Sequence, residues 1–157
     1  MTKFIGVSLT LLLVASLASA VVIESSYEAT LPLIDRVPAM LTDGGFSSGA
    51  IAARRTGIIL GKTATFKASA VELNNIVSNV GEEMYFKKKG VVLDGKRYAL
   101  VKTDSGSLAA ETAGRGVLAR LASGVWIIGV YGQRLTRDEA EKVIDQVVDY
   151  FNEELNA

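Results

Sequence analysis

The chain has 157 residues, about the size of one domain. Its 17 basic and 17 acidic side chains cancel, which argues against a nucleic-acid-binding domain, because such a domain usually carries a basic excess. It contains no cysteine and no histidine, which excludes disulfides, cysteine-based metal sites and Ser-His-Asp or Cys-His catalytic arrangements. We therefore expect a binding protein that is not an enzyme and that uses no cofactor and no metal.

The N-terminal segment, residues 1–23, carries no charge after Lys3. Its basic start, apolar run and closing Ala18-Ser19-Ala20 are typical of a cleaved secretory signal. The run is also just long enough for a membrane anchor. A third interpretation is an uncleaved hydrophobic extension ahead of a cytosolic domain. We treat residues 1–23 as an N-terminal extension and residues 24–157 as the folded domain.

Apolar side chains at helical spacing in residues 24–43 predict a first helix. Pro32 suits a first helical turn, where its missing N–H costs nothing. Pro38 lies inside the pattern and is expected to kink or end the helix. The pair Gly44-Gly45 then closes the segment.

Two short apolar runs, 49–53 and 57–60, flank a turn-like segment and predict a β-hairpin. Further along, Ser69 and Glu72 have the spacing of a capping box, in which each side chain caps the other residue's backbone. Apolar residues at helical spacing follow, so a short helix is predicted there.

Between residues 90 and 131, short apolar runs alternate with turn signals, of which Asp94-Gly95 is the strongest. Such short connections predict an antiparallel meander, because parallel strand pairs need long crossovers. The three lysines at 87–89 are expected to lie in a solvated loop, with an acidic lipid as the alternative contact. The predicted strands span residues 90–94, 96–103, 107–112, 116–122 and 124–131.

A second capping box, formed by Thr136 and Glu139, begins the last predicted helix. One face of this helix is apolar and must pack on another element, most simply the sheet. The sequence thus predicts an α+β domain with an antiparallel sheet of about seven strands. The N- and C-terminal helices would cover one face and the short helix the other. The apolar positions are Ala140, Val143, Ile144, Val147, Val148, Phe151 and Leu155.

Three stretches carry a distinctive combination of residues and order. They are 48–60, the run Gly90-Val-Val-Leu-Asp-Gly-Lys-Arg-Tyr98, and 127–151, which opens with Ile127-Ile-Gly-Val-Tyr131. They resemble, in that order, the first hairpin, a strand pair, and the final strand and helix of the profilin family. The resemblance covers about residues 30–155 and implies a profilin-like fold.

The resemblance also implies that the chain binds monomeric actin and regulates actin polymerisation, because profilins cap one end of the monomer and hinder nucleation. Profilins contact actin through their later strands and the start of the last helix. The positions that fall there are Arg115, Arg120, Arg137, Glu141 and Lys142. Many family members have a lysine pair where this chain has Glu111-Thr112, a departure that bears on affinity for ordinary eukaryotic actin.

Binding of proline-rich segments is a second activity that the resemblance implies, through an aromatic groove between the terminal helices. Tyr150 and Phe151 match two groove positions, and Tyr27 is the nearest N-terminal aromatic, out of register. Leu60 stands where the family has a tryptophan, so we expect weak binding. Phe151 also lies on the apolar helix face, which favours core packing for it. Binding of anionic phosphoinositides is implied as well.

A different class of protein also combines a curved antiparallel sheet with flanking helices, namely the roadblock- or longin-like scaffolds that dimerise and bind small GTPases. We expect a monomer, and the balanced charge argues against binding of nucleic acid. Because actin is cytosolic, the profilin resemblance favours a cytoplasmic, cytoskeletal location, with a cleaved signal or membrane anchor at residues 1–23 as the alternative.

Overall fold

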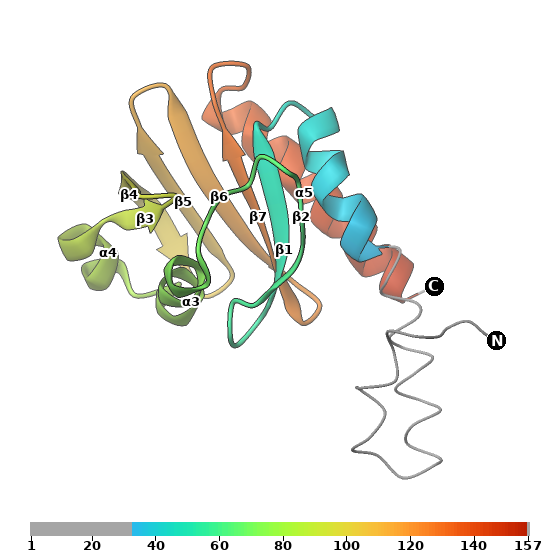
Figure 1. The fold of residues 1–157 in the computed structure, drawn as a ribbon, viewed down its shortest axis with the longest axis horizontal. Coiled ribbons are helices and arrows are strands. Elements are labelled where there is room, and N and C mark those ends of the chain that lie inside the picture. The colour runs from blue at the N-terminus through green and yellow to red at the C-terminus, as the bar shows by residue number, and fades with distance from the viewer. Residues whose placement is uncertain (1–32, 157) are drawn as a thin grey trace, which may run out of the picture. The chain divides into compact units, whose positions relative to one another are not determined.

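The computed structural model describes residues 33–156, and these form a seven-stranded antiparallel sheet with helices on both faces (Figure 1). The predictions for residues 1–23, Pro32 and Tyr27 lie outside the described residues. No helix within residues 33–156 combines the length and apolarity that crossing a bilayer requires.

The sheet has the strand order β2-β1-β7-β6-β5-β4-β3, and every neighbouring pair is antiparallel. The predicted hairpin and five-strand meander are therefore confirmed, and the hairpin joins the meander through pairing of β1 with β7. The strands are β1 (Ser48–Ala53), β2 (Ile59–Lys62), β3 (Val91–Leu93), β4 (Lys96–Asp104), β5 (Ser107–Thr112), β6 (Arg115–Ala122) and β7 (Val125–Tyr131).

Helices cover the two faces as the sequence predicts (Figure 1). The helix at residues 33–43 and α5 (Arg137–Leu155) lie on one face, and α3 (Ala70–Asn79) and α4 (Glu83–Lys89) lie on the other. We call these the α5 face and the α3 face. The buried side chains of α5 are Ala140, Ile144, Val147 and Phe151, which belong to the predicted apolar stripe.

The prediction for Pro38 is wrong in one respect, because the helix continues past it to residue 43. Proline cannot donate to the carbonyl four residues earlier, which here belongs to Ile34. That carbonyl faces Gly61 on β2, where a Cβ atom would overlap it. The helix is terminated instead two residues after its end by Gly45, whose φ is 115° and whose N–H donates to the Thr42 carbonyl at 3.0 Å.

The three lysines at 87–89 lie in the last turn of α4 rather than in the expected loop. An ion pair of 2.7 Å between Lys87 and Glu83, one turn apart, supports this short helix. Positive side chains in a last helical turn also interact favourably with the helix dipole. The loop prediction failed because no cap or apolar period marks so short a helix in the sequence.

Glu72 joins two elements that are distant in sequence. It completes the predicted capping box of α3 by accepting from the Ser69 N–H at 3.0 Å, while Ser69 Oγ accepts from the Glu72 N–H at 3.1 Å. The same carboxylate accepts from the N–H groups of Asp94 and Gly95, both at 2.9 Å. The φ values of Asp94 and Gly95, 53° and 70°, are those of a tight hairpin turn. Glu72 therefore anchors the β3–β4 turn to the start of α3.

Candidate functional site

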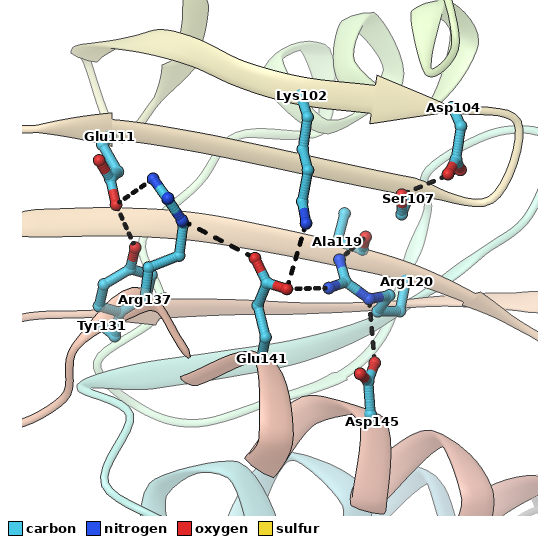
Figure 2. Close-up of polar contacts among 10 residues, drawn as sticks. All are labelled: Lys102, Asp104, Ser107, Glu111, Ala119, Arg120, Tyr131, Arg137, Glu141 and Asp145. Atoms are coloured by element: carbon cyan, nitrogen blue, oxygen red, sulfur yellow. Dashed lines mark hydrogen bonds and ion pairs between the residues drawn. The ribbon is translucent and has the colours of Figure 1, made fainter. Parts of the chain in front are cut away.

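A network of charged side chains lies between the α5 face of the sheet and the first half of α5 (Figure 2). Successive strands β4 to β7 each contribute one side chain, and α5 contributes three from consecutive turns. Three cations and three carboxylates balance each other. We call this set the ion-pair network; its members are Lys102, Glu111, Arg120, Tyr131, Arg137, Glu141 and Asp145.

Arg120 is the most enclosed cation of the network. Its side chain is 13% exposed, and it reaches from β6 across to α5 (Figure 2). Nε donates to Asp145 Oδ1 at 3.0 Å, and Nη2 lies 3.5 Å from Glu141 Oε1. Because the guanidinium is planar and keeps its charge, these two carboxylates fix its orientation. Arg120 thus ties the middle of the sheet to α5.

Glu141 is the central carboxylate, and its side chain is 20% exposed. Besides Arg120, it accepts from Lys102 Nζ at 3.3 Å and lies 3.9 Å from Arg137 Nε (Figure 2). Because three cations surround it, the Glu141 carboxylate is already compensated and is not available to a further positive partner. Its main role in this geometry is to hold the cations in place.

Tyr131 closes the network at the end of β7. Its hydroxyl donates to Glu111 Oε2 at 3.1 Å, and Arg137 Nη1 lies 3.1 Å from the same oxygen. Burial, and then the hydrogen bond to Glu111, raise the pKa of Tyr131 well above its usual value, so the hydroxyl keeps its proton. The ring crosses β6 at Gly116, where any Cβ atom would overlap it.

The structure brings together three of the five side chains expected at an actin surface, namely Arg120, Arg137 and Glu141. Lys142, next to Glu141 on α5, is exposed and forms no ion pair among the described residues. Arg115 forms no ion pair with these four residues. It lines a cavity on the α3 face with Phe66 and Tyr98, which belong to the core under α3.

The two aromatic residues expected in a proline-binding groove have different environments. Phe151 is 0% exposed and packs in the core, as its position on the apolar helix face indicated. Tyr150 is half-buried, and its hydroxyl accepts a hydrogen bond from Arg36 of the helix at residues 33–43. The Arg36 guanidinium carbon also lies 5.6 Å from the centre of the Tyr150 ring. Only Tyr150 therefore offers a ring face near the surface, and Arg36 already contacts it.

A comparison with protein-family models matches residues 35–155 to the family described as Profilin. The match spans most of the chain and nearly all the residues described above. The chain belongs to the profilin family. The family match also decides between the two fold classes that the sequence left open, in favour of profilin over a roadblock- or longin-like scaffold.

Solved profilin structures share the fold at low sequence identity. Profilin IA of Acanthamoeba castellanii is 18% identical, with a TM-score of 0.69 over 80% of this chain and 98% of that one. Profilin II of the same organism is 21% identical, with a TM-score of 0.66 over 72% of this chain and 90% of that one. Mouse profilin IIa, solved in complex with a double repeat from the FH1 domain of mDia1, is 18% identical, with a TM-score of 0.57 over 73% and 92%.

Sequence reasoning missed three members of the network in this profilin, namely Lys102, Tyr131 and Asp145, and it missed the structural role of Glu111. A signal was present in α5, where Arg137, Glu141 and Asp145 recur every four residues along one face. The strand partners gave no comparable signal, because their contacts depend on which strands pair and in which register.

Proposed function

We propose that this profilin binds monomeric actin and regulates actin polymerisation through the surface formed by β4 to β6 and the first half of α5. The observation that carries the proposal is the family match over residues 35–155. The surface itself supports it, because it presents fixed charges on a rigid sheet and helix rather than on loops. The mechanism is steric: a bound profilin covers one end of the monomer and hinders nucleation.

The ion-pair network suggests which charged residues hold the surface in place and which can contact a partner. Arg120 and Glu141 are engaged with each other and largely enclosed, so they position the surface. Arg137 is more exposed, and Lys142 is exposed with no ion pair among the described residues. These two cations, together with Lys102, whose side chain is 57% exposed, are the ones best placed to meet an acidic partner. Glu111 accepts from Tyr131 and pairs with Arg137, so it presents a compensated charge.

Actin polymerisation followed by fluorescence, with full-length profilin and actin from the same organism, tests this proposal. Wild-type protein should slow nucleation, and Lys142→Glu should weaken the effect by about 3- to 10-fold, because reversing a rim charge slows association. Lys88→Glu, an exposed lysine on α4 at the other face, is the matched control and should behave as wild type. No slowing at an excess of wild-type protein would rule out actin binding as the main activity.

Binding of proline-rich segments is a second candidate, and the mouse profilin IIa complex with FH1 repeats favours it. In this chain Tyr150 is the available aromatic, and a ligand that stacks on its ring would compete with Arg36, which lies over it. We therefore propose weak binding. Titration of a fluorescently labelled proline-rich peptide should show an affinity that Arg36→Gln raises and Tyr150→Ala abolishes. Equal affinities for all three proteins would place the peptide elsewhere.

The location that fits this function is the cytosol, where actin lies, with residues 1–23 as an uncleaved extension. Mass spectrometry of the protein from its own cells tests this directly. A mature N-terminus near Val21 would contradict it.

Anionic phosphoinositides are a further proposed ligand, since profilins bind them through basic surface residues.

A further inference from the structure

A cavity of about 320 Å³ opens on the α3 face, beside the turn between β3 and β4. Five buried residues line it, and none of them carries a charge. They provide aromatic rings, an aliphatic side chain and hydroxyl groups, so the wall combines apolar surface with uncharged polar groups. The buried lining residues are Ser48, Phe66, Leu93, Tyr98 and Tyr131.

Two of the buried hydroxyl groups have no hydrogen-bond partner. Ser48 is 6% exposed and Tyr98 is 2% exposed, and neither hydroxyl hydrogen bonds to any group within residues 33–156. The Tyr131 hydroxyl, by contrast, donates to Glu111. Buried polar groups in native proteins are almost always paired, so each exception calls for an explanation. A ligand that carries an oxygen atom would provide the missing partner in the cavity.

Charged side chains lie at the rim of the cavity rather than in its interior. Lys67, Lys96 and Arg115 are exposed, as is the carboxylate of Asp94. None of the four forms an ion pair with another described residue. Exposed charges keep their water and provide no buried counter-charge. A charged group that entered the interior would lose its own water against uncharged walls, which is costly. The interior therefore favours an uncharged ligand.

The volume of the cavity sets the size of such a ligand. A dry apolar cavity of about 150 Å³ accepts benzene, so this larger cavity has room for one substituted ring. Phe66 and Leu93 supply apolar surface for the ring. Each unpaired hydroxyl can donate to an oxygen substituent or accept from it. Water can occupy the same space, but only a ring removes the apolar walls from water.

We propose that this cavity binds a small uncharged ring compound that carries a hydroxyl group, of the phenol class. The ligand hydroxyl hydrogen bonds to Ser48 and Tyr98 in the interior, and the ring packs on the apolar wall. Because these recognition groups are neutral and buried, the site is separate from any contact of the exposed rim cations with an anion. The proposal does not rest on actin binding, since neither Arg137 nor Lys142 lines the cavity.

Isothermal titration calorimetry with the full chain and two matched probes tests the chemistry. The phenol 4-methylphenol should bind, and toluene, which has the same ring and methyl group without the hydroxyl, should bind severalfold more weakly. An excess of inorganic phosphate should not displace 4-methylphenol, because the probe is uncharged. Failure of 4-methylphenol to bind, equal affinities for the two probes, or displacement by phosphate would each overturn the proposal.

Substitutions then place the binding in the cavity. Tyr98→Phe keeps the buried ring but removes the hydroxyl, so it should weaken 4-methylphenol severalfold and leave the affinity for toluene unchanged or higher. Ser48→Ala should also reduce the preference for 4-methylphenol over toluene. Each variant removes an unpaired hydroxyl, so the thermal midpoint of the free protein should be retained.

Tyr85→Phe is the matched control, because Tyr85 lies on α4 and does not line the cavity. This variant should keep the wild-type preference for 4-methylphenol. A preference that survives unchanged in both Tyr98→Phe and Ser48→Ala would overturn the assignment to this cavity. Loss of the preference in Tyr85→Phe as well would overturn it too, because the effect would then not depend on the hydroxyls of the cavity.

Discussion

The two faces of the sheet use charged side chains in opposite ways. On the α5 face, three cations and three carboxylates pair with one another, and the Tyr131 hydroxyl has a partner. On the α3 face, the cavity has three cations without ion pairs among the described residues and two hydroxyls without partners. A polar group that the fold already satisfies mainly holds structure together, whereas one left unsatisfied is available to a ligand.

One strand contributes to both arrangements. Arg115 and Arg120 lie in β6, five positions apart, and an odd separation puts side chains on opposite sides of a strand. The same residue type therefore has an enclosed, paired guanidinium in one case and a cavity-lining one in the other. The identity of a residue does not distinguish these roles, but its partners do.

The largest loss of stability is expected for a substitution at Gly116 on the α5 face. Gly116→Ala places a methyl group where the Tyr131 ring lies, so the ring must move and lose Glu111. We expect a loss of about 2–3 kcal/mol in the free energy of unfolding, measured by urea denaturation. Gly106→Ala is the control, because its new Cβ would meet only Leu121 at 3.8 Å. Equal, small losses would show that Tyr131 is not held against β6.

Next in size is the removal of the enclosed cation. Arg120→Gln leaves Glu141 and Asp145 without their guanidinium, and should cost about 1–2 kcal/mol in urea denaturation because the pair is largely screened from water. Lys102→Gln removes an exposed partner of the same carboxylate and should cost about 0.5 kcal/mol or less. Similar costs for the two variants would contradict the structural role given to Arg120.

Glu72 provides a pH-dependent effect on the α3 face. Burial alone would raise the pKa of Glu72, but hydrogen bonds from the backbone of Ser69, Gly95 and Asp94 outweigh it and lower the pKa below its usual value. A carboxyl with a lowered pKa stabilises the fold above its unfolded pKa of about 4.3, and this contribution is lost as the pH falls through the folded pKa.

Urea denaturation of Glu72→Gln tests this effect. At about pH 7 the variant should be less stable than wild type by about 1 kcal/mol, because the neutral amide makes weaker hydrogen bonds. The difference should shrink as the pH falls through the folded pKa of Glu72, where the wild-type carboxyl itself takes up a proton. Glu82→Gln, whose side chain makes no capping bond, is the control. A difference that does not change with pH would contradict the assigned cause.

The smallest effect compares the same change on the two faces in phosphate-free buffer. Tyr131→Phe removes a paired hydroxyl and should cost about 1 kcal/mol in unfolding free energy. Tyr98→Phe removes an unpaired one and should change it by about 0.5 kcal/mol or less, with any change towards higher stability. A clear cost at Tyr98 would show that its hydroxyl is already satisfied in the free protein.

Much of the fold could be predicted because its signals are local. The capping boxes at Ser69 and Thr136 and the turn at Asp94-Gly95 depend on residues close in sequence, and all three form as expected. The helix through Pro38 could not be predicted, because its tolerance depends on a distant glycine on β2. Local rules also missed α4, which has neither a capping side chain nor a long apolar period.

The candidate site could be predicted only in part. The α5 members lie on one helix face, so their proximity follows from spacing alone. The sequence analysis grouped Arg115 with Arg120. Separating them requires knowing which side of β6 each side chain occupies. The cavity was not foreseen at all, since Ser48 and Tyr98 come from strands at different places in the sheet and their missing partners are visible only in three dimensions.

Both edges of the sheet are short (Figure 1). The edge strands β2 and β3 have 4 and 3 residues, while the inner strands have 6 to 9. A bulge also interrupts the pairing of β2 with β1. Long, regular edges invite pairing with another copy of a chain, and these offer little backbone for it. The protein can thus accumulate to high concentration without its sheets joining into aggregates.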